Sequence, residues 1–569
     1  MNTPNPSFLK PGLLAASGLL LLTACTIGGG RSGNADGFVN AQSMTGGTTI
    51  LSAVTPTAPA GKNAFGRDRS AGGAGLTVAG VTSKRGLGVS APSTVVYDLG
   101  AQCRTFTARV GVDDESGAGG SATFKVLVDD RPLFDSGVLK AGRATAVNVN
   151  VEGGETLKLV VEGGAKSHAD WADAQVEGCV VYKGPVEVVP SGSGTLTITG
   201  NYRSDDPDVP AIKISTTQPV VIQNCVLAGR GHLISTRKQG EFMTRANVTV
   251  QNCRGYGLNP DERMREPGRF LHLQGPANVN VQNNFMKQTG GIYIQGGQGN
   301  SMSRLQIVRN RALNIDGRRS NGAGGWLTPG ASDAQEKFFR AQFVQLNDAR
   351  AVPDAEIAWN RVENEPGYSR VEDNINIYVS SGTPGHPIRI HHNLIRGAYA
   401  YPPELAGYSG GGIITDGCLS RYVDIGNNTV LETSNHGIAI ANGESVAIHD
   451  NLVLGTGLLP GGRHAGGADN GIYVRWARSC SQLGVQAGNN SVTGNTVGFG
   501  QPTANDPDQR SDLYVATNSQ GKPLAQQSGN TLVAPTNERI TRSQPDIIER
   551  AVTDWEGQLG SNNVVVGAQ

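Results

Sequence analysis

The sequence lacks the features that identify several common classes of protein. Only 5% of its 569 residues are aromatic, and its 48 basic residues are balanced by 48 acidic residues. No basic run stands out, so the electrostatic footprint of a nucleic-acid-binding protein is missing. The seven cysteines form no CxxC motif and no Cys/His cluster with zinc-ligand spacing. The sequence therefore argues against a nucleic-acid partner and against a structural zinc site.

Glycine, in contrast, is abundant. Its 79 residues are about twice the usual share of roughly 7%. Because the glycines follow no fixed period, they do not indicate a collagen helix, and many short strands joined by tight turns explain them better. The length is sufficient for more than one domain with a sizeable core.

The first 25 residues have the pattern of an export signal. A single charge, Lys10, precedes a short apolar stretch that ends in Leu22-Thr23-Ala24-Cys25. This ending resembles the lipobox of bacterial lipoproteins, which implies lipidation of Cys25 and a lipid-anchored protein of the bacterial cell envelope. The alternative is an ordinary signal peptide that is cleaved nearby. Residues 26–47 then form a flexible tether.

Six cysteines remain after Cys25, an even number that suits an oxidising compartment. Cys103 and Cys179 lie near the start and at the end of the first predicted domain, and a disulfide between them is expected. Cys225 and Cys253 occupy the same slot of successive repeats, so they are either bonded or stacked as buried thiols.

Residues 48–183 are predicted to form an antiparallel β-sandwich. Short alternating segments such as TFTARVGV, ATFKVLVD and TLKLVVEG are separated by turn residues. The motifs FGRDRSAGGAGLTVAG, RGLGVSAPSTVVYDLG, FKVLVDDRPLFDSGVL and SHADWADAQV, in this order, resemble the NPCBM domain, a carbohydrate-binding module attached to glycoside hydrolases. The resemblance implies a galactose-binding-like fold.

The resemblance also marks individual positions in this domain. They are Gly86, Gly88, Asp113, Asp114, His168, Asp170, Trp171 and Asp173. His168, Asp170 and Trp171 are predicted to bind sugar, because they combine an aromatic face with polar neighbours. Asp113 and Asp114 either bind Ca²⁺ or cap a turn. Ser90 departs from the family, which usually has histidine there.

The second half of the chain repeats one short phrase. An apolar residue, any residue, Ile or Val and two further residues precede Asn or Cys, as in VVIQNC at Cys225, LQIVRN at Asn310 and VAIHDN at Asn451. The copies recur about every thirty residues, which predicts a right-handed, single-stranded parallel β-helix over residues 190–535. The Asn residues are predicted to stack as a structural amide ladder. The fold class is therefore all-β.

Residues 536–569 are predicted to form a capping helix and tail. Ile548, Val552 and Trp555 have helical spacing, and we expect this helix to cover the open end of the coil.

A second set of strands offers the outward positions on which a ligand could bind. Aligning GIYIQG, NINIYV, GIITDG, GIAIANG and GIYVRWA brings polar and aromatic residues onto one face. The tyrosines predicted to contact carbohydrate are Tyr293, Tyr378 and Tyr473. The residues predicted to be catalytic are Asp373, Asp416, His436 and Arg475.

This series distantly resembles pectin-degrading β-helix enzymes. In polygalacturonase-like hydrolases the motifs NTD, DD, GHG and RIK follow along successive coils, and here Asn435-His436-Gly437 matches the third. The second motif departs, because Gly410 and Gly411 stand where two carboxylates are expected. Hydrolysis by inversion needs a carboxylic acid and a base. The alternative reaction is that of a lyase, which needs a base and a cation. Arg475, with Ca²⁺ as a cofactor, would supply the positive charge.

Together these patterns predict an exported protein whose β-helix binds a polysaccharide and cleaves it as a lyase or a glycoside hydrolase. The alternative is a non-catalytic envelope protein that binds glycans or adheres through them, with the β-helix as a rigid scaffold. The Gly410-Gly411 gap and the small residues Ala439 and Ala441 on the face favour this alternative.

Overall fold

The computed structural model describes residues 46–58, 65–164, 167–238, 241–242, 245–296, 302–328, 340–405, 409–467, 469–476, 488–503, 509–532 and 546–569, together with Met44, Gly407, Cys480 and residues 505–506. Almost all regular structure in these residues is β-strand. Within them, no helix combines the length and apolar character that crossing a bilayer requires. The predicted export signal, the lipidation site Cys25 and the tether up to residue 43 lie outside the described residues.

The first domain is a sandwich of two antiparallel sheets. One sheet contains β1 (Gly47–Ile50), β2 (Phe65–Arg67), β5 (Gly86–Ser90), β7 (Thr105–Val112), β10 (Ala144–Asn150) and β12 (His168–Cys179). The other contains β6 (Ser93–Asp98), β8 (Ser121–Val128), β9 (Arg131–Lys140) and β11 (Thr156–Gly163). A separate hairpin joins β3 (Leu76–Val78) to β4 (Val81–Ser83). The sandwich predicted from the alternating segments is confirmed.

Alternate residues of both sheets fill the sandwich core. Trp171 is its largest side chain, has no exposed surface and packs against Phe106 and Phe124 with ring centroids 6.2 and 5.3 Å apart. The expected disulfide joins Cys103 to Cys179 beside this core. Because one cysteine precedes β7 and the other ends β12, the bond closes a 76-residue separation and restricts the unfolded chain.

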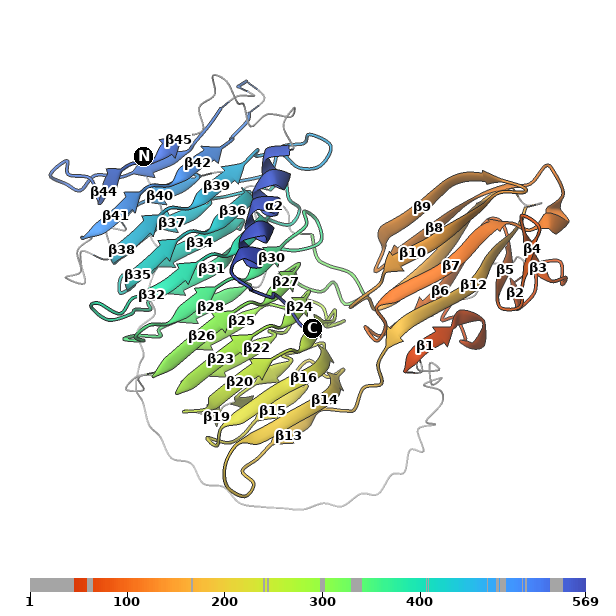
Figure 1. Ribbon diagram of the computed structural model, residues 1–569, viewed down its shortest axis with the longest axis horizontal. Helices are drawn as coiled ribbons and strands as arrows, with labels where there is room; N and C mark the ends of the chain where they lie inside the picture. Colours follow the sequence, from red (N-terminus) through yellow and green to blue (C-terminus); the bar gives the residue numbers. More distant parts are fainter. Residues whose placement is uncertain are drawn as a thin grey trace, which may run out of the picture. The chain divides into compact units, whose positions relative to one another are not determined.

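The second domain is a parallel β-helix built from two long sheets (Figure 1). The first sheet contains β13 (Val186–Val188), β15 (Ile212–Ile214), β17 (Ile234–Ser235), β22 (Leu271–Gln274), β25 (Ile292–Gln295), β28 (Val344–Asn347), β31 (Asp373–Tyr378), β34 (Gly411–Asp416), β37 (Ile438–Ile440), β40 (Ile472–Val474) and β43 (Leu513–Val515). Each strand pairs in parallel with the strand one coil away, as in β31 with β34. We call this sheet the site sheet.

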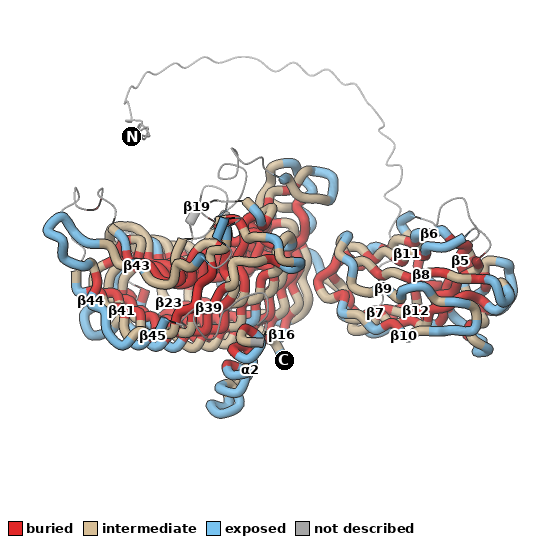
Figure 2. Tube along the Cα trace, turned by 90° about the horizontal axis from the view of Figure 1, so that it is seen from above, coloured by how far each residue is buried: buried red, intermediate tan, exposed pale blue. Residues whose placement is uncertain are grey.

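The second sheet carries one long strand from each of the first two coils and two strands from each later coil, and we call it the ladder sheet. Its strands are β14 (Leu196–Ser204), β16 (Val220–Gly229), β20 (Asn247–Gln251), β21 (Arg254–Gly257), β23 (Asn278–Gln282), β24 (Phe285–Lys287), β26 (Arg304–Val308), β27 (Arg311–Leu313), β29 (Glu356–Ala358), β30 (Arg361–Glu363), β32 (Ile388–His391), β33 (Leu394–Ala398), β35 (Arg421–Gly426), β36 (Thr429–Thr433), β38 (Glu444–His449), β39 (Leu452–Gly455), β41 (Asn490–Thr493), β42 (Thr496–Phe499), β44 (Ala525–Ser528) and β45 (Thr531–Leu532). Apolar residues two apart, such as Ile388 and Ile390, are fully buried between the sheets (Figure 2). Each such side chain contributes roughly 1.5–3 kcal/mol by burial.

The predicted amide ladder is confirmed at the corner between the two strand rows of the ladder sheet. Asn360 is typical: its Nδ2 donates to Asn393 Oδ1 at 2.9 Å and to Ile307 O at 2.8 Å. Its Oδ1 accepts from the backbone N–H and the side-chain amide of Asn310. The same contacts recur in successive coils, so each side chain pairs with backbone groups that the turn leaves open.

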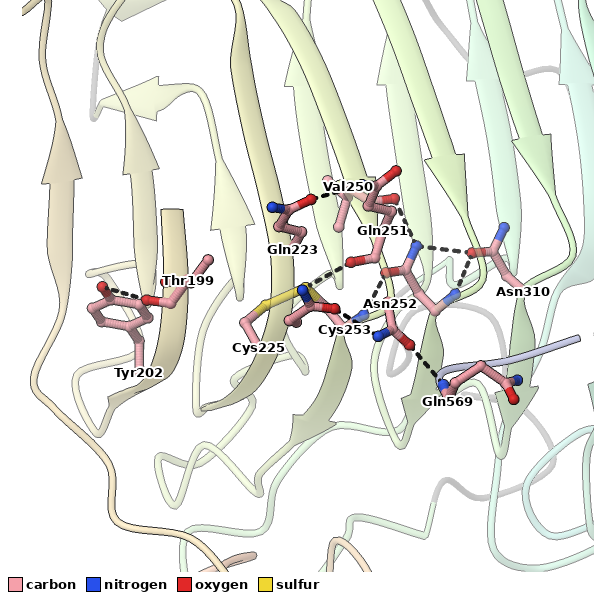
Figure 3. Close-up of a disulfide and its surroundings, with 12 residues drawn as sticks. Thr199, Tyr202, Gln223, Cys225, Val250, Gln251, Asn252, Cys253, Asn310 and Gln569 are labelled. Carbon is pink, nitrogen blue, oxygen red and sulfur yellow. Dashed lines mark hydrogen bonds between the residues drawn. A yellow bond between two sulfur atoms is a disulfide. The ribbon is translucent and has the colours of Figure 1, made fainter. Parts of the chain in front are cut away.

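Two further disulfides join neighbouring parts of the β-helix. Cys225 and Cys253 stand in the ladder position of the preceding coils and are bonded rather than stacked as thiols (Figure 3). Cys418 follows β34 and is bonded to Cys480. Figure 3 also shows that the amide ladder begins directly beside the first of these bonds, where Cys253 N donates to Asn284 Oδ1 at 3.0 Å.

The predicted C-terminal helix exists as α2 (Asp546–Ser561), but its expected place at the open end of the coil is wrong. The helix lies on the flank of the ladder sheet (Figure 1). Trp555 is fully buried there and donates from Nε1 to His392 O at 2.9 Å. The reason is a row of outward apolar residues, one per coil, that the helix covers: Leu394, Leu431 and Leu454.

Candidate functional site

The outward face of the site sheet gathers polar and aromatic residues from successive coils. The strand register places two files of residues on this face. One runs through His272, Tyr293, Gln345, Asn376, Ile414, Ala439 and Tyr473, and the other through Gln274, Gln295, Asn347, Tyr378 and Asp416. Parallel strands lie about 4.8 Å apart, so each coil places one new side chain beside the last.

At the corner that leads into this sheet, Asp373 and His436 meet across a vacant position. They belong to coils two strand spacings, or about 9.6 Å, apart, yet His436 Nε2 lies 3.5 Å from Asp373 Oδ1. Between them stands Gly411, which pairs with Asp373 in the sheet. A Cβ at Gly411 would lie 2.2 Å from Asp373 Oδ1 and 2.7 Å from His436 Nε2. The missing side chain is therefore what allows the two groups to approach.

Burial controls the protonation of this pair. It raises the pKa of Asp373 well above the usual range, and the negative charges of Glu372 and Asp416 raise it further. Burial also lowers the pKa of His436 to about 3, with the positive charge of Arg475 as a smaller cause. Burial therefore favours the protonated form of Asp373 and the uncharged form of His436. Asn376 Nδ2 donates to the other oxygen of Asp373, Oδ2, at 2.9 Å.

Two buried polar atoms of this corner lack a hydrogen-bond partner among the described residues. They are His436 Nε2 and Asn376 Oδ1. Leaving such an atom unpaired costs about 1–3 kcal/mol, and native proteins concentrate such costs at functional sites. This corner is therefore the strongest candidate for chemistry on the β-helix.

Glu372 is a carboxylate of the site that sequence reasoning missed. Its Oε2 accepts from Gln342 Nε2 at 2.7 Å, and Arg340 Nε lies 3.6 Å from its Oε1. Burial raises the pKa of Glu372, against the opposing effect of Arg340. The adjacent carboxylates Glu372 and Asp373 are visible in the sequence. Only the geometry of the corner shows that both belong to one site.

Asp416 approaches from the other end of β34. It lies five residues beyond Gly411, the partner of Asp373, and pairs in register with Tyr378. Five residues of strand correspond to a Cα separation of about 16 Å. Asp416 is half-buried, and its Oδ1 accepts from Gly417 N at 2.6 Å. Tyr378 beside it is 40% exposed and offers an aromatic ring to solvent.

Arg475 is also brought to this face, but its charge is already matched. Its Nη1 donates to Asp469 Oδ2 at 2.5 Å, and its Nη2 donates to the other oxygen, Oδ1. The guanidinium lies over Tyr473, 4.5 Å from the ring centroid, and Tyr473 meets His436 edge to face at 5.4 Å. The structure therefore brings Asp373 and His436 into contact and links His436 to Arg475 through Tyr473. Asp416, the fourth residue predicted to be catalytic, lies at the other end of β34.

Tyr293 lies on the same face towards the N-terminal coils. It stacks on His272 at 5.2 Å between ring centroids, and its hydroxyl accepts from Asn347 Nδ2 at 2.6 Å. It is half-buried, so one part of its ring remains accessible.

In the sandwich, the prediction that Asp170 and Trp171 bind sugar is corrected. Both side chains have no exposed surface. The register pairs Trp171 with Leu87 and Val110, so its ring points into the core. Burial and the neighbouring Asp113 raise the pKa of Asp170 to about 10. His168 is accessible, with its Nδ1 2.6 Å from Glu115 Oε1.

Asp113 and Asp114 act as caps, the second of the two roles considered for them. Asp113 accepts from the backbone N–H groups of Thr77 and Glu115, and Asp114 accepts from those of Ala79 and Gly80. They thereby hold the β3–β4 hairpin against the end of β7. In the described part of the chain, no group of three or more His, Cys, Asp or Glu side chains is arranged to hold a metal ion.

Comparison with known proteins agrees with the sandwich. Residues 47–177 match the family model of the NPCBM/NEW2 domain. The sandwich is an NPCBM domain. A curated relative is "Putative endo-alpha-N-acetylgalactosaminidase" of Renibacterium salmoninarum, 38% identical over 117 residues. That match covers 20% of this chain and 8% of the relative, so the chain spans a small part of the protein that it matches.

Two solved structures illustrate the matches, one to a small part of the chain and one to most of it. The module CBM51 from Clostridium perfringens GH95, in complex with methyl-galactose, is 31% identical with a TM-score of 0.22, covering 23% of this chain and 99% of that module. The catalytic domain of a GH87 alpha-1,3-glucanase is 11% identical with a TM-score of 0.25, covering 88% of this chain and 98% of that domain. TM-scores this low carry no information about the residues of the site.

Proposed function

We propose that this protein binds glycans through its NPCBM domain and hydrolyses a polysaccharide on the site sheet of its β-helix. The observation that carries the proposal is that one face holds a buried carboxyl group whose pKa is raised, that of Asp373, and a half-buried carboxyl group, that of Asp416. A glycosidase needs one carboxylic acid and one carboxylate. The sequence similarity of the NPCBM domain to part of a glycosidase supports the same class of substrate.

Each residue has a separate role in the proposed reaction. Asp373 donates its proton to the leaving oxygen, while His436 and Asn376 orient its carboxyl group. Asp416 accepts a proton from the attacking water. The Cα atoms of the two residues lie about 16 Å apart along the strands, which is wider than the roughly 6.5–9.5 Å between the carboxyl groups of inverting enzymes and the roughly 5 Å of retaining enzymes. The proposed reaction therefore requires both side chains to turn towards a sugar bound between the two strand ends.

Hydrolysis is favoured over the lyase mechanism by the state of Arg475. A lyase needs a cation to neutralise the sugar carboxylate beside the proton that is removed. Arg475 is bound by both oxygens of Asp469. Scaffold function remains the second candidate, because Asp373 and His436 are almost fully buried and the file between them and Asp416 contains the apolar residues Ile414 and Ala439.

Incubation of the full chain with a panel of neutral, amino-sugar and uronate polysaccharides tests this proposal. We expect new reducing ends on at least one glycan without the ultraviolet absorbance of an unsaturated uronate, both with Ca²⁺ and with a chelator. Asp416→Asn should reduce the rate at least about a hundredfold. Asp424→Asn, which changes an outward carboxylate of the ladder sheet, is the matched control and should leave the rate unchanged.

Three outcomes separate the alternatives. If no glycan yields product while insoluble glycans are still bound, hydrolysis is ruled out and the non-catalytic scaffold function is supported. An unsaturated product would establish the lyase. A Ca²⁺ requirement would show that the cation takes part in the reaction or in folding of the site.

A further inference from the structure

The cations near the site all have acceptors within the protein. Arg475 is held by Asp469 through two nitrogen–oxygen contacts. Arg269 is buried and donates to Gly290 O at 2.5 Å and to Arg340 O at 2.7 Å. Arg340 lies beside Glu372. Arg475 and Arg269 are therefore engaged before any ligand binds, whereas the Arg340 side chain is 77% exposed and only its Nε lies near Glu372.

Carboxylates, in contrast, converge on the same place. Glu372 and Asp416 both act electrostatically on Asp373, and Asp416, Asp469 and Asp373 all act on Tyr473. A sugar that carried its own carboxylate would enter next to the carboxyl groups of Glu372 and Asp416. Like charges at such distances repel, and the repulsion is stronger where water is excluded.

Asp469 is the residue on which this balance depends. It is 25% exposed, and its two oxygens face the two terminal nitrogens of Arg475. A guanidinium presents this pair of N–H groups to a carboxylate in a bidentate fork. Asp469 thus fills the position that the carboxylate of a uronate would occupy on Arg475.

We propose that Asp469 is a specificity-determining residue that makes the site select neutral sugars and reject uronates. By occupying Arg475, it removes a cation that stands beside both Tyr473 and the exposed Tyr514. The inference rests on the proposed function, because it concerns the sugar bound at the same site. If Asp469 has this role, the substrate is a polysaccharide whose sugar unit at the cleavage point carries no carboxylate.

Binding of tri-galacturonate to the full chain, followed by calorimetry, tests the role of Asp469. The parent protein is expected to bind it weakly. Asp469→Asn, which keeps the size of the side chain, should release Arg475 and tighten the dissociation constant about tenfold, the effect of one charge-assisted contact. High salt should abolish the gain. Asp469→Ser is a second variant in case the asparagine retains Arg475 through its oxygen.

Two controls make the result specific. Glu549→Gln frees Arg396 on the flank of the ladder sheet and should leave tri-galacturonate binding unchanged. Combining Asp469→Asn with Arg475→Gln should cancel the gain. The proposal is overturned if the parent binds tri-galacturonate as tightly as the variants do, or if both folded Asp469 variants gain nothing. This experiment measures binding of tri-galacturonate, whereas the test of the proposed function measures cleavage of neutral glycans. A failure of hydrolysis is therefore distinguishable from a failure of the proposal for Asp469.

Discussion

Two corners of the same coil differ in how they treat polar groups. At the ladder corner, asparagine recurs in coil after coil, and Asn393 and Asn428 repeat the contacts of Asn360. At the corner that leads into the site sheet, the residue changes with each coil, from Asp373 to Gly411 to His436. The ladder corner repeats the same asparagine contacts in each coil. The corner of the site sheet combines different residues from three coils in one arrangement.

This difference separates a corner that stabilises the fold from the corner that we propose as the reactive site. The ladder asparagines are buried and satisfy backbone groups on both sides, so each contributes to stability. The site corner instead retains the unpaired His436 Nε2 and a buried carboxyl group whose pKa is raised, both of which cost stability. Uniform repetition is the sign of a scaffold, and costly irregularity is the sign of a functional site.

Removing one ladder side chain should have the largest effect on stability. Asn360→Ala leaves Ile307 O and the Asn310 N–H without their partners inside the coil. We expect the free energy of unfolding to fall by about 3 kcal/mol, measured by urea unfolding. Gln526→Ala, at an exposed position of β44, should change it by less than about 0.5 kcal/mol. Equal effects would mean that the ladder does not stabilise the coil.

The scaffold could be predicted from the sequence because it repeats. Alternation of apolar residues and recurrence of Asn were sufficient to predict the ladder, the two strand files and the β-helix itself. The position of α2 could not be predicted, since Leu394, Leu431 and Leu454 become a continuous surface only when the coils are stacked. The prediction that Trp171 binds sugar was wrong for a related reason. The register of β12 with Leu87 and Val110 decides which face of the strand is inward.

The site could be predicted only in part. Asp373, Asp416, His436 and Arg475 were identified from their order along the coils, and the structure brings them to one face. Gly411 was interpreted as the loss of a carboxylate, although its missing side chain creates the space in which Asp373 and His436 meet. The value of a vacant position depends on the residues one coil before and after it, which spacing alone does not reveal.

Filling that space should have the next largest effect. Gly411→Ala places a methyl group 2.2 Å from Asp373 Oδ1, which must move away from His436. We expect the rate of glycan hydrolysis to fall about a hundredfold, or roughly 2.7 kcal/mol in activation free energy. Gly488→Ala is the control, because a Cβ there has open space. An unchanged rate would show that the Asp373–His436 contact is not needed.

The smallest effect concerns protonation of two histidines that each lie near an aspartate. Asp424, 3.1 Å from His449, raises the pKa of His449 to about 9, whereas burial lowers that of His436 to about 3. Nitrogen NMR near pH 7 should show His449 protonated and His436 neutral. His449 should stabilise the fold fully below the usual histidine pKa of about 6.5, and this is lost as pH rises through about 9.

For His436 the sign is opposite. Its pKa is depressed on folding, so its favourable contribution is present above the usual histidine value and is lost as pH falls towards about 3. A protonated His436 at neutral pH would contradict the neutral pair that we derive for the corner.

The most direct test of the account is glycan hydrolysis by Asp373→Asn, assayed on protein whose free energy of unfolding has been measured. The side chain keeps its size but loses the proton that it donates. The account predicts a rate at least about a hundredfold lower, with stability unchanged or increased because a costly buried carboxyl has been removed. A retained rate, or a loss of stability like that of Asn360→Ala, would contradict the assignment of this corner to chemistry.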